Sequence, residues 1–406
     1  MTATSPRSVQ PNTIPQRRGS RLKAVPRLIV IACLVFFHQP TLAAYTATAV
    51  TTNQPQSQFN SGAQANRALA AQAALHNCRQ ALAVSNPTNS VCELAFMDDQ
   101  PVAAAATIRA STDNAPLYLW RFDSASATVF IAGTVHVLKE ALHPLPRQFE
   151  QAYYQTEKLV LEVDLSRYPP AEVNAKTLAY ARLGDQSLRQ VMPAALYDQL
   201  VQAGMTYGLP VGQLQAYQPV LAFQQLTLLG MTALGYEGDF GVEHVIGQLG
   251  QRGREDILQL ESLDFQLNLL FNQPIDTQLA VLDQALSDLP ELESSISQLM
   301  TAYFQGNDDA LLAILTAQTG DHPLAKAFND QLIDQRNRGM AKKIAGYLET
   351  PHSYLVLVGA GHLVGPSSII AELARAGIHG QRIGADQSIH HPVHYPKHHS
   401  TNHREH

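Results

Sequence analysis

The pattern of apolar and polar residues divides the folded part of the chain into strand-like runs at both ends and a long helical stretch between them. Short apolar runs bounded by turn residues predict strands, and runs without polar alternation are typical of strands buried on both faces. The predicted strands are 117–122, 128–133, 158–164, 256–261, 353–358 and 381–383. The turn residues 123–126 join the first two, which predicts a β-hairpin.

Helices are predicted where apolar residues recur every three to four positions. This pattern runs from residue 170 to about 251 and from 264 to 348, and shorter helices are predicted at 144–155 and 366–376. The predicted class is therefore α/β or α+β. We expect a mixed sheet formed by N- and C-terminal strand segments and covered by helices, with a large helical insertion between the two groups of strands.

The N-terminal residues have the order of charge and hydrophobicity that is typical of a secretory signal peptide. Basic residues between Arg17 and Arg27 precede an apolar run over 28–37 and small residues at 41–44. The run is too short to span a hydrocarbon core of ~30 Å. We expect residues 1–44 to be removed, no stable membrane span afterwards, and a periplasmic or secreted location. An uncleaved N-terminal anchor is the alternative.

Two segments have compositions that predict no packed core. Residues 45–112 are rich in Ala, Thr, Gln, Asn and Ser, which predicts a mostly disordered linker with an Ala-rich stretch over 66–82 that can form a helix. Residues 386–406 carry seven of the sixteen histidines and are predicted to be a disordered tail. The folded domain is then expected over 113–385.

Charge and cysteine content narrow the functional classes. The net charge of −6 gives no electrostatic reason to expect a nucleic acid, which would require a clustered basic surface, so we expect no such partner. Cys78 and Cys92 remain once the signal segment is removed. An oxidising compartment would let them form a disulfide, and two unpaired thiols are the alternative.

The strongest chemical signal is a pattern that occurs twice. Gly133-Thr134-Val135-His136 and Gly359-Ala360-Gly361-His362 each follow a predicted strand and end in a histidine. Glycine lets the backbone turn sharply or approach a ligand closely, and open α/β sheets bind ligands beyond the carboxyl ends of their strands. On adjacent strands, His136 and His362 would point into one space. Duplicated structure without chemistry is the alternative.

Two glutamates complete the predicted site. Glu162 lies in an otherwise apolar run, and a buried carboxylate must be paired, metal-bound or protonated because its desolvation is costly. Glu261 ends another predicted strand, where capping of the next helix is the alternative. Two histidines with one or two glutamates suit Mn²⁺, Zn²⁺, Co²⁺ or Fe²⁺. Such an ion would lower the pKa of water and polarise a carbonyl group, and a free glutamate could accept the proton.

The ordered set of motifs resembles the TraB/GumN family, which is related to the Tiki metalloproteases and more distantly to erythromycin-esterase-like and ChaN-like proteins. The resemblance covers residues 116–384. The segments that carry it are Leu117-Tyr118-Leu119-Trp120, Gly133-Thr134-Val135-His136, Pro144-Leu145-Pro146, 159–164, Gly241-Val242-Glu243, Gln259-Leu260-Glu261, 336–341 and 358–366.

The resemblance implies roles for the matching positions. It implies that His136 and His362 are metal ligands, that Glu162 is a ligand or general base, and that Glu261 is the acid of the second half. It also implies that Arg336 stabilises an oxyanion, and an arginine on a helix surface is the alternative. The chain departs from the family pattern at Gln259, where Gly is usual, and at Glu243, where Asp is usual.

Together these observations favour an exported hydrolase that depends on a divalent metal ion, Mn, Co or Zn, and acts on a peptide or protein substrate. One alternative is a non-catalytic periplasmic or envelope binding protein that keeps the same fold. Another is ester or lactone hydrolysis on this scaffold.

Overall fold

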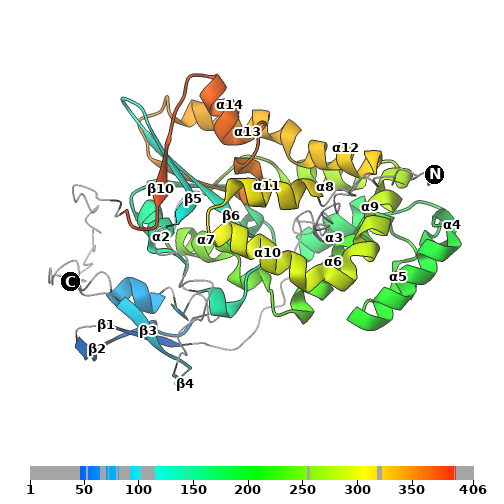
Figure 1. Ribbon diagram of the computed structural model, residues 1–406, viewed down its shortest axis with the longest axis horizontal. Coiled ribbons are helices and arrows are strands. Elements are labelled where there is room, and N and C mark those ends of the chain that lie inside the picture. The colour runs from blue at the N-terminus through cyan, green and yellow to red at the C-terminus, as the bar shows by residue number, and fades with distance from the viewer. Residues whose placement is uncertain are drawn as a thin grey trace, which may run out of the picture.

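The computed structural model (Figure 1) describes most of the chain between residues 46 and 389. The exceptions within this range are 52–53, 65–69, 72, 79–80, 82–91, 99, 102–114, 144, 254–256, 318–321 and 388. The predicted signal peptide over 1–44 and residues 390–406 of the predicted tail lie outside the described residues. Among the described residues, no helix combines the length and apolar character that crossing a bilayer requires.

The main sheet has six strands, and both ends of the folded region contribute to it. Across the sheet the order is β10 (Gln381–Gly384), β5 (Pro116–Asp123), β6 (Thr128–Thr134), β9 (Tyr354–Gly359), β7 (Lys158–Leu161) and β8 (Leu258–Gln259). Strand β5 is antiparallel to β6 and β10, whereas β6, β9, β7 and β8 are parallel. The predicted class, a mixed sheet built from N- and C-terminal segments, is confirmed.

Strand β9 lies in the middle of this sheet, between β6 and β7. Its residues 354–358 are all apolar and buried, as expected of a parallel strand covered on both faces. The register pairs Thr134 with Gly359 and Leu161 with Leu357. The carboxyl ends of β6, β9 and β7 therefore finish at one edge of the sheet.

Helices cover the sheet and fill the predicted insertion between β7 and β9. They are α2 (Arg147–Tyr154), α3 (Pro170–Tyr180), α4 (Leu188–Val191), α5 (Ala194–Tyr207), α6 (Pro219–Ala233), α7 (Val242–Gly253), α8 (Leu263–Phe271), α9 (Ile275–Asp288), α10 (Leu292–Phe304), α11 (Asp308–Ala317), α12 (Pro323–Leu332), α13 (Asp334–Tyr347) and α14 (Ile369–Arg375). In Figure 1, α13 and α14 lie above the sheet, and α2 and α7 lie below it.

Local sequence signals mark several helix ends. Ser262 and Ser368 are the N-caps of α8 and α14, where their hydroxyls accept backbone N–H groups. Gly208 ends α5 in the left-handed conformation, with φ of 79°, which favours glycine. Capping, rather than apolar periodicity, thus sets these boundaries.

A small separate unit lies where the sequence predicts a linker. Its four-stranded antiparallel sheet has the order β2-β1-β3-β4, from β1 (Ala47–Thr51), β2 (Gln54–Asn60), β3 (Cys92–Met97) and β4 (Gln100–Pro101). A helix that includes residues 73–78 packs Ala74 and Leu75 against Ala47 and Ala49. The linker prediction differs from the structure because the core consists mainly of small alanines, which a segment rich in Thr, Gln and Asn conceals.

A disulfide stabilises the small unit, and side-chain contacts connect it to the main domain. Cys78 and Cys92 form a disulfide, with their Cα atoms 6.0 Å apart. His76 lies 3.0 Å from a carboxylate oxygen of Glu150 and stacks on Tyr154, and both of these residues belong to α2. The helix of the small unit therefore contacts α2 of the main domain.

Candidate active site

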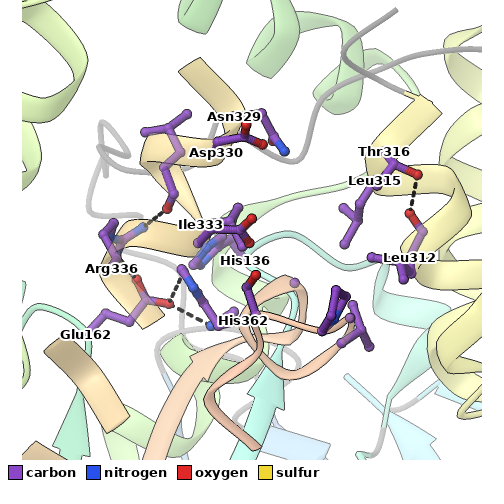
Figure 2. Close-up of a pocket in the computed structure, with 18 residues that line it drawn as sticks. His136, Glu162, Leu312, Leu315, Thr316, Asn329, Asp330, Ile333, Arg336 and His362 are labelled. Carbon is purple, nitrogen blue, oxygen red and sulfur yellow. Dashed lines mark hydrogen bonds and ion pairs between the residues drawn. The ribbon is translucent and has the colours of Figure 1, made fainter. Parts of the chain in front are cut away.

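A cavity of about 260 Å³ lies beyond the carboxyl ends of β6, β9 and β7. His136 follows β6, Glu162 follows β7, and His362 lies in the 3₁₀ helix η7 (Ala360–Leu363) after β9. Arg336 reaches the same cavity from α13. Figure 2 shows Glu162 and Arg336 at one end and the side chains of α11 across the cavity from them. The location is the edge where open α/β sheets bind ligands.

His362 is held through its Nδ1 atom, and no described residue forms a hydrogen bond with its Nε2 atom. Its Nδ1 lies 2.6 Å from Oδ1 of Asn337, and the amide nitrogen of Asn337 donates to the Ser367 carbonyl at 2.8 Å. This second bond orients the amide so that Nδ1 of the imidazole donates. Burial lowers the pKa of His362 to about 4, so the ring is neutral at neutral pH. In this tautomer the free lone pair of the ring is on Nε2. The distance from Nε2 to Oε1 of Glu162 is 3.7 Å.

His136 is anchored in the same way by a carboxylate. Its Nδ1 forms a short hydrogen bond to Glu243, whose other oxygen accepts a bond of 2.6 Å from the Thr134 hydroxyl. Burial alone would lower the pKa of His136, but the Glu243 carboxylate outweighs it and raises the pKa above its ordinary value. The Nε2 atom faces Gly359 (3.8 Å from the position of a Cβ added there).

Glu162 is buried and paired, and it lies one residue beyond β7 instead of inside a strand. Its Oε1 accepts the Gly359 N–H at 2.6 Å, and its Oε2 accepts Nη2 of Arg336 at 2.5 Å. Burial opposes ionisation, but Arg336 and the other partners hold the pKa of Glu162 at about 2. The buried carboxylate is therefore ionised and paired with Arg336.

Arg336 lies between two carboxylates. Its Nε donates to Glu261 at 2.9 and 3.0 Å, and its Nη2 lies 2.7 Å from the same group. Its Nη1 donates to the Leu332 carbonyl at 2.9 Å. Arg336 is thus not a helix-surface residue, and Glu261 is not the cap of α8, because Ser262 occupies that position.

The glycines of the repeated pattern serve different purposes. A Cβ at Gly359 would lie 3.5 Å from Glu162 Oε1, 3.7 Å from His362 Cδ2 and 3.8 Å from His136 Nε2. Gly359 therefore leaves open a point that these three side chains surround. A Cβ at Gly133 would instead lie only 2.9 Å from both Leu363 and Tyr118. Gly133 is thus required for close packing.

The side chains around Gly359, two imidazoles and a carboxylate, are of the kinds that bind divalent cations. Within the described part of the chain, no three or more His, Cys, Asp or Glu side chains already form a metal-binding group. Two ligands of one tetrahedral ion lie about 3.4 Å apart when each is about 2.1 Å from it. The 3.7 Å between His362 Nε2 and Glu162 Oε1 is close to that separation. Metal-binding histidines also anchor their second nitrogen, as His136 and His362 do.

Two residues of this arrangement were not predicted as parts of the site. Asn337 lies in the motif 336–341, and Glu243 was noted only as a departure from the family pattern. A histidine ligand needs a partner for its second nitrogen, which is the signal that could have led to them. Which acid or amide is the partner depends on how α7 and α13 pack, and one sequence does not reveal that.

The fold and the site define an α/β protein with paired histidines at the ends of parallel strands. The chain matches the model of the TraB/PrgY/gumN family over residues 118–382, and it belongs to that family. It is also similar to metalloprotease TIKI1 of Danio rerio, with 21% identity over 308 residues that cover 64% of this chain and 62% of that protein. The match thus spans less than two thirds of the relative's length. No solved structure matches the chain.

Proposed function

We propose that the chain is an exported hydrolase that depends on a divalent metal ion and cleaves peptide bonds. The observation that supports this most is the convergence of His136, His362 and Glu162 around Gly359, with both imidazoles anchored through Nδ1. The similarity to a protein named a metalloprotease supports peptide bonds as the target. The predicted signal peptide supports a periplasmic or secreted location.

His136, His362 and Glu162 would hold the ion, and Mn²⁺, Co²⁺ or Zn²⁺ suits nitrogen and oxygen donors. A bound ion of this kind supplies Lewis acidity and lowers the pKa of water to about 7. Glu162 is a poor general base at neutral pH because its pKa is about 2, so we assign it the role of a ligand.

Arg336 acts in this proposal on the carboxylates and not on an oxyanion. Its Nε, Nη1 and Nη2 atoms all donate to protein acceptors, and two of those acceptors are the side chains of Glu162 and Glu261. The guanidinium therefore neutralises the buried acids and fixes the direction of Glu162. Both oxygens of Glu261 accept hydrogen bonds from Arg336, so Glu261 serves the same positioning role.

Metal binding by the purified exported chain tests the proposal directly. We expect one equivalent of Mn²⁺, Co²⁺ or Zn²⁺ to bind in calorimetric titration, and the double variant His136→Ala/His362→Ala to bind none at this site. Metal-loaded protein is then assayed on matched panels of peptides and esters. Absence of binding for all three ions would contradict the proposal and favour a non-catalytic binding protein. Cleavage of esters alone would change the substrate class.

Removing the anchor of His136 is expected to weaken metal binding without removing a ligand. Glu243→Ala deletes the carboxylate that holds Nδ1, and losses of this type cost about 10- to 100-fold in metal affinity. Competition titration with a chromophoric chelator measures the change. Glu172→Ala, at an exposed glutamate of α3, is the matched control and should leave the affinity unchanged. Unchanged affinity in Glu243→Ala would show that His136 is not a ligand.

A further inference from the structure

A second, smaller cavity of about 50 Å³ adjoins the first. The two cavities share His136, Leu315, Gly359 and Gly361 in their walls. The smaller one, which we call the side pocket, extends from this shared wall towards α10 and the end of α6. Its apolar walls are Met231, Ile296, Leu299, Met300, Leu311 and Leu315. A group bound at Gly359 therefore lies next to an apolar recess.

The polar side chains at the side pocket already have partners. The Thr134 hydroxyl donates to Glu243 at 2.6 Å, and Ser295 donates to the Glu291 carbonyl at 2.9 Å. The Tyr303 hydroxyl donates to the Gly133 carbonyl at 2.8 Å. An acceptor group in the pocket would lose its water and find no free hydroxyl donor in exchange, and an ammonium group would be desolvated with no carboxylate among the lining residues, which is costly in both cases. The pocket therefore favours an apolar occupant.

The size of the pocket narrows the occupant further. Its volume of about 50 Å³ holds roughly three to five atoms of water size. The side chains of Val, Leu, Ile and Met are of this size, whereas an alanine methyl leaves most of the space empty. Met231 and Met300 in the wall are flexible, and they let the pocket fit side chains of slightly different shape.

We propose that the side pocket is the subsite for an aliphatic side chain, Val, Leu, Ile or Met, of the residue beside the cleaved bond. This inference rests on the peptidase function proposed above. The shared residues His136 and Gly359 place the recess next to the reacting bond, so the occupant belongs to a residue adjacent to that bond. The pocket selects substrates because each missing methylene leaves a void and each polar group goes unpaired.

The test compares capped pentapeptides of sequence Ala-Ala-Xaa-Ala-Ala, in which Xaa is Ala, Leu, Phe or Lys. Affinities are first measured by NMR titration on metal-free protein, where no cleavage occurs. We expect the Leu peptide to bind about 10-fold or more tightly than the Ala and Lys peptides. Met231→Phe fills the pocket and should shift the preference to Ala, and Met231→Ala enlarges it and should shift the preference to Phe. For each variant, the ratio of the affinities for two peptides is measured on the same protein sample, so a misfolded fraction does not change it.

Met205→Ala is the matched control, because Met205 is 72% exposed on α5, and it should retain the wild-type preference. Equal binding of the Leu and Ala peptides, or the same preference in both Met231 variants, would overturn the subsite. The same peptides are then assayed for cleavage with Mn²⁺, Co²⁺ and Zn²⁺. Selective binding without cleavage would contradict the peptidase function but support an apolar binding pocket. Cleavage without selectivity would support the peptidase function and contradict the subsite.

Discussion

Replacing Arg336 by methionine is expected to lower the free energy of unfolding by about 3 to 5 kcal/mol. Arg336 is buried and donates to Glu162, which is also buried, and to Glu261, which is partly buried. Methionine fills most of the volume but leaves two carboxylates in a water-poor site without a counter-charge. Equilibrium unfolding in urea, on metal-free protein, measures the loss.

The matched control lies two residues further along the same helix. Arg338 is exposed, and Arg338→Met should change the free energy of unfolding by less than about 0.5 kcal/mol. If Arg336→Met lowered the free energy of unfolding no more than Arg338→Met does, the ion pairs of Arg336 with Glu162 and Glu261 would not stabilise the fold.

The same cluster sets a pH dependence. The pKa of Glu162 is about 2 in the folded protein against 4.5 ordinarily, so its contribution to stability is complete above 4.5 and is lost as the pH falls towards 2. The free energy of unfolding of the metal-free wild type should fall over that window. In Arg336→Met, Glu162 lacks its cation and burial raises its pKa, so lowering the pH should reduce the loss of stability that this variant shows at neutral pH.

Gly359→Ala is expected to reduce the proposed metal-dependent activity by about 100-fold or more while the fold remains intact. The added methyl lies in ordinary contact with Glu162, His362 and His136, at 3.5 to 3.8 Å, so nothing must move to admit it. The backbone there has φ of −53° and ψ of 136°, which alanine adopts freely. The methyl does, however, fill the point that the three side chains surround.

Two other glycines separate the effect on activity from the effect on the fold. Gly339→Ala in α13 meets no atom within 4 Å and should leave activity unchanged. Gly133→Ala forces the new carbon to within 2.9 Å of Leu363 and Tyr118, so it should lower thermal stability. Thermal unfolding and kcat/KM are measured on all three variants. Full activity in Gly359→Ala would mean that the space around Gly359 is not where the reaction takes place.

Much of the fold could be predicted from apolar patterning alone. Strands β6 and β9 have long apolar runs, and burial on both faces makes such runs easy to recognise. The small sheet was missed because β1 alternates alanine with threonine and valine, so its buried face is made of small, weakly hydrophobic groups. The order of the strands also required the structure, since β9 pairs with strands far away in the sequence.

The positions of His136, His362 and Glu162 at the ends of neighbouring strands could be predicted from the sequence, whereas two of the residues that hold them could not. Each of these residues is recognisable because it is a polar residue that follows directly on an apolar, strand-like run. The partners Glu243 and Asn337 leave no such signal, because they lie on helices where a polar residue is ordinarily exposed. Arg336 was expected at the site from the family resemblance, but its pairing with Glu162 and Glu261 required the structure. Gly133 and Gly359 look alike in the repeated pattern, and only their neighbours reveal that one permits packing and the other leaves space.

The central position of β9 has a consequence for the newly made chain. Ribosomes release β6 and β7 roughly 200 residues before β9, which must then enter between them. A nascent chain that ends before residue 354 has His136 and Glu162 but neither His362 nor the glycine around which they meet. The proposed enzyme would therefore be inactive throughout its own translation. It would gain activity only when β9 has paired with β6 and β7.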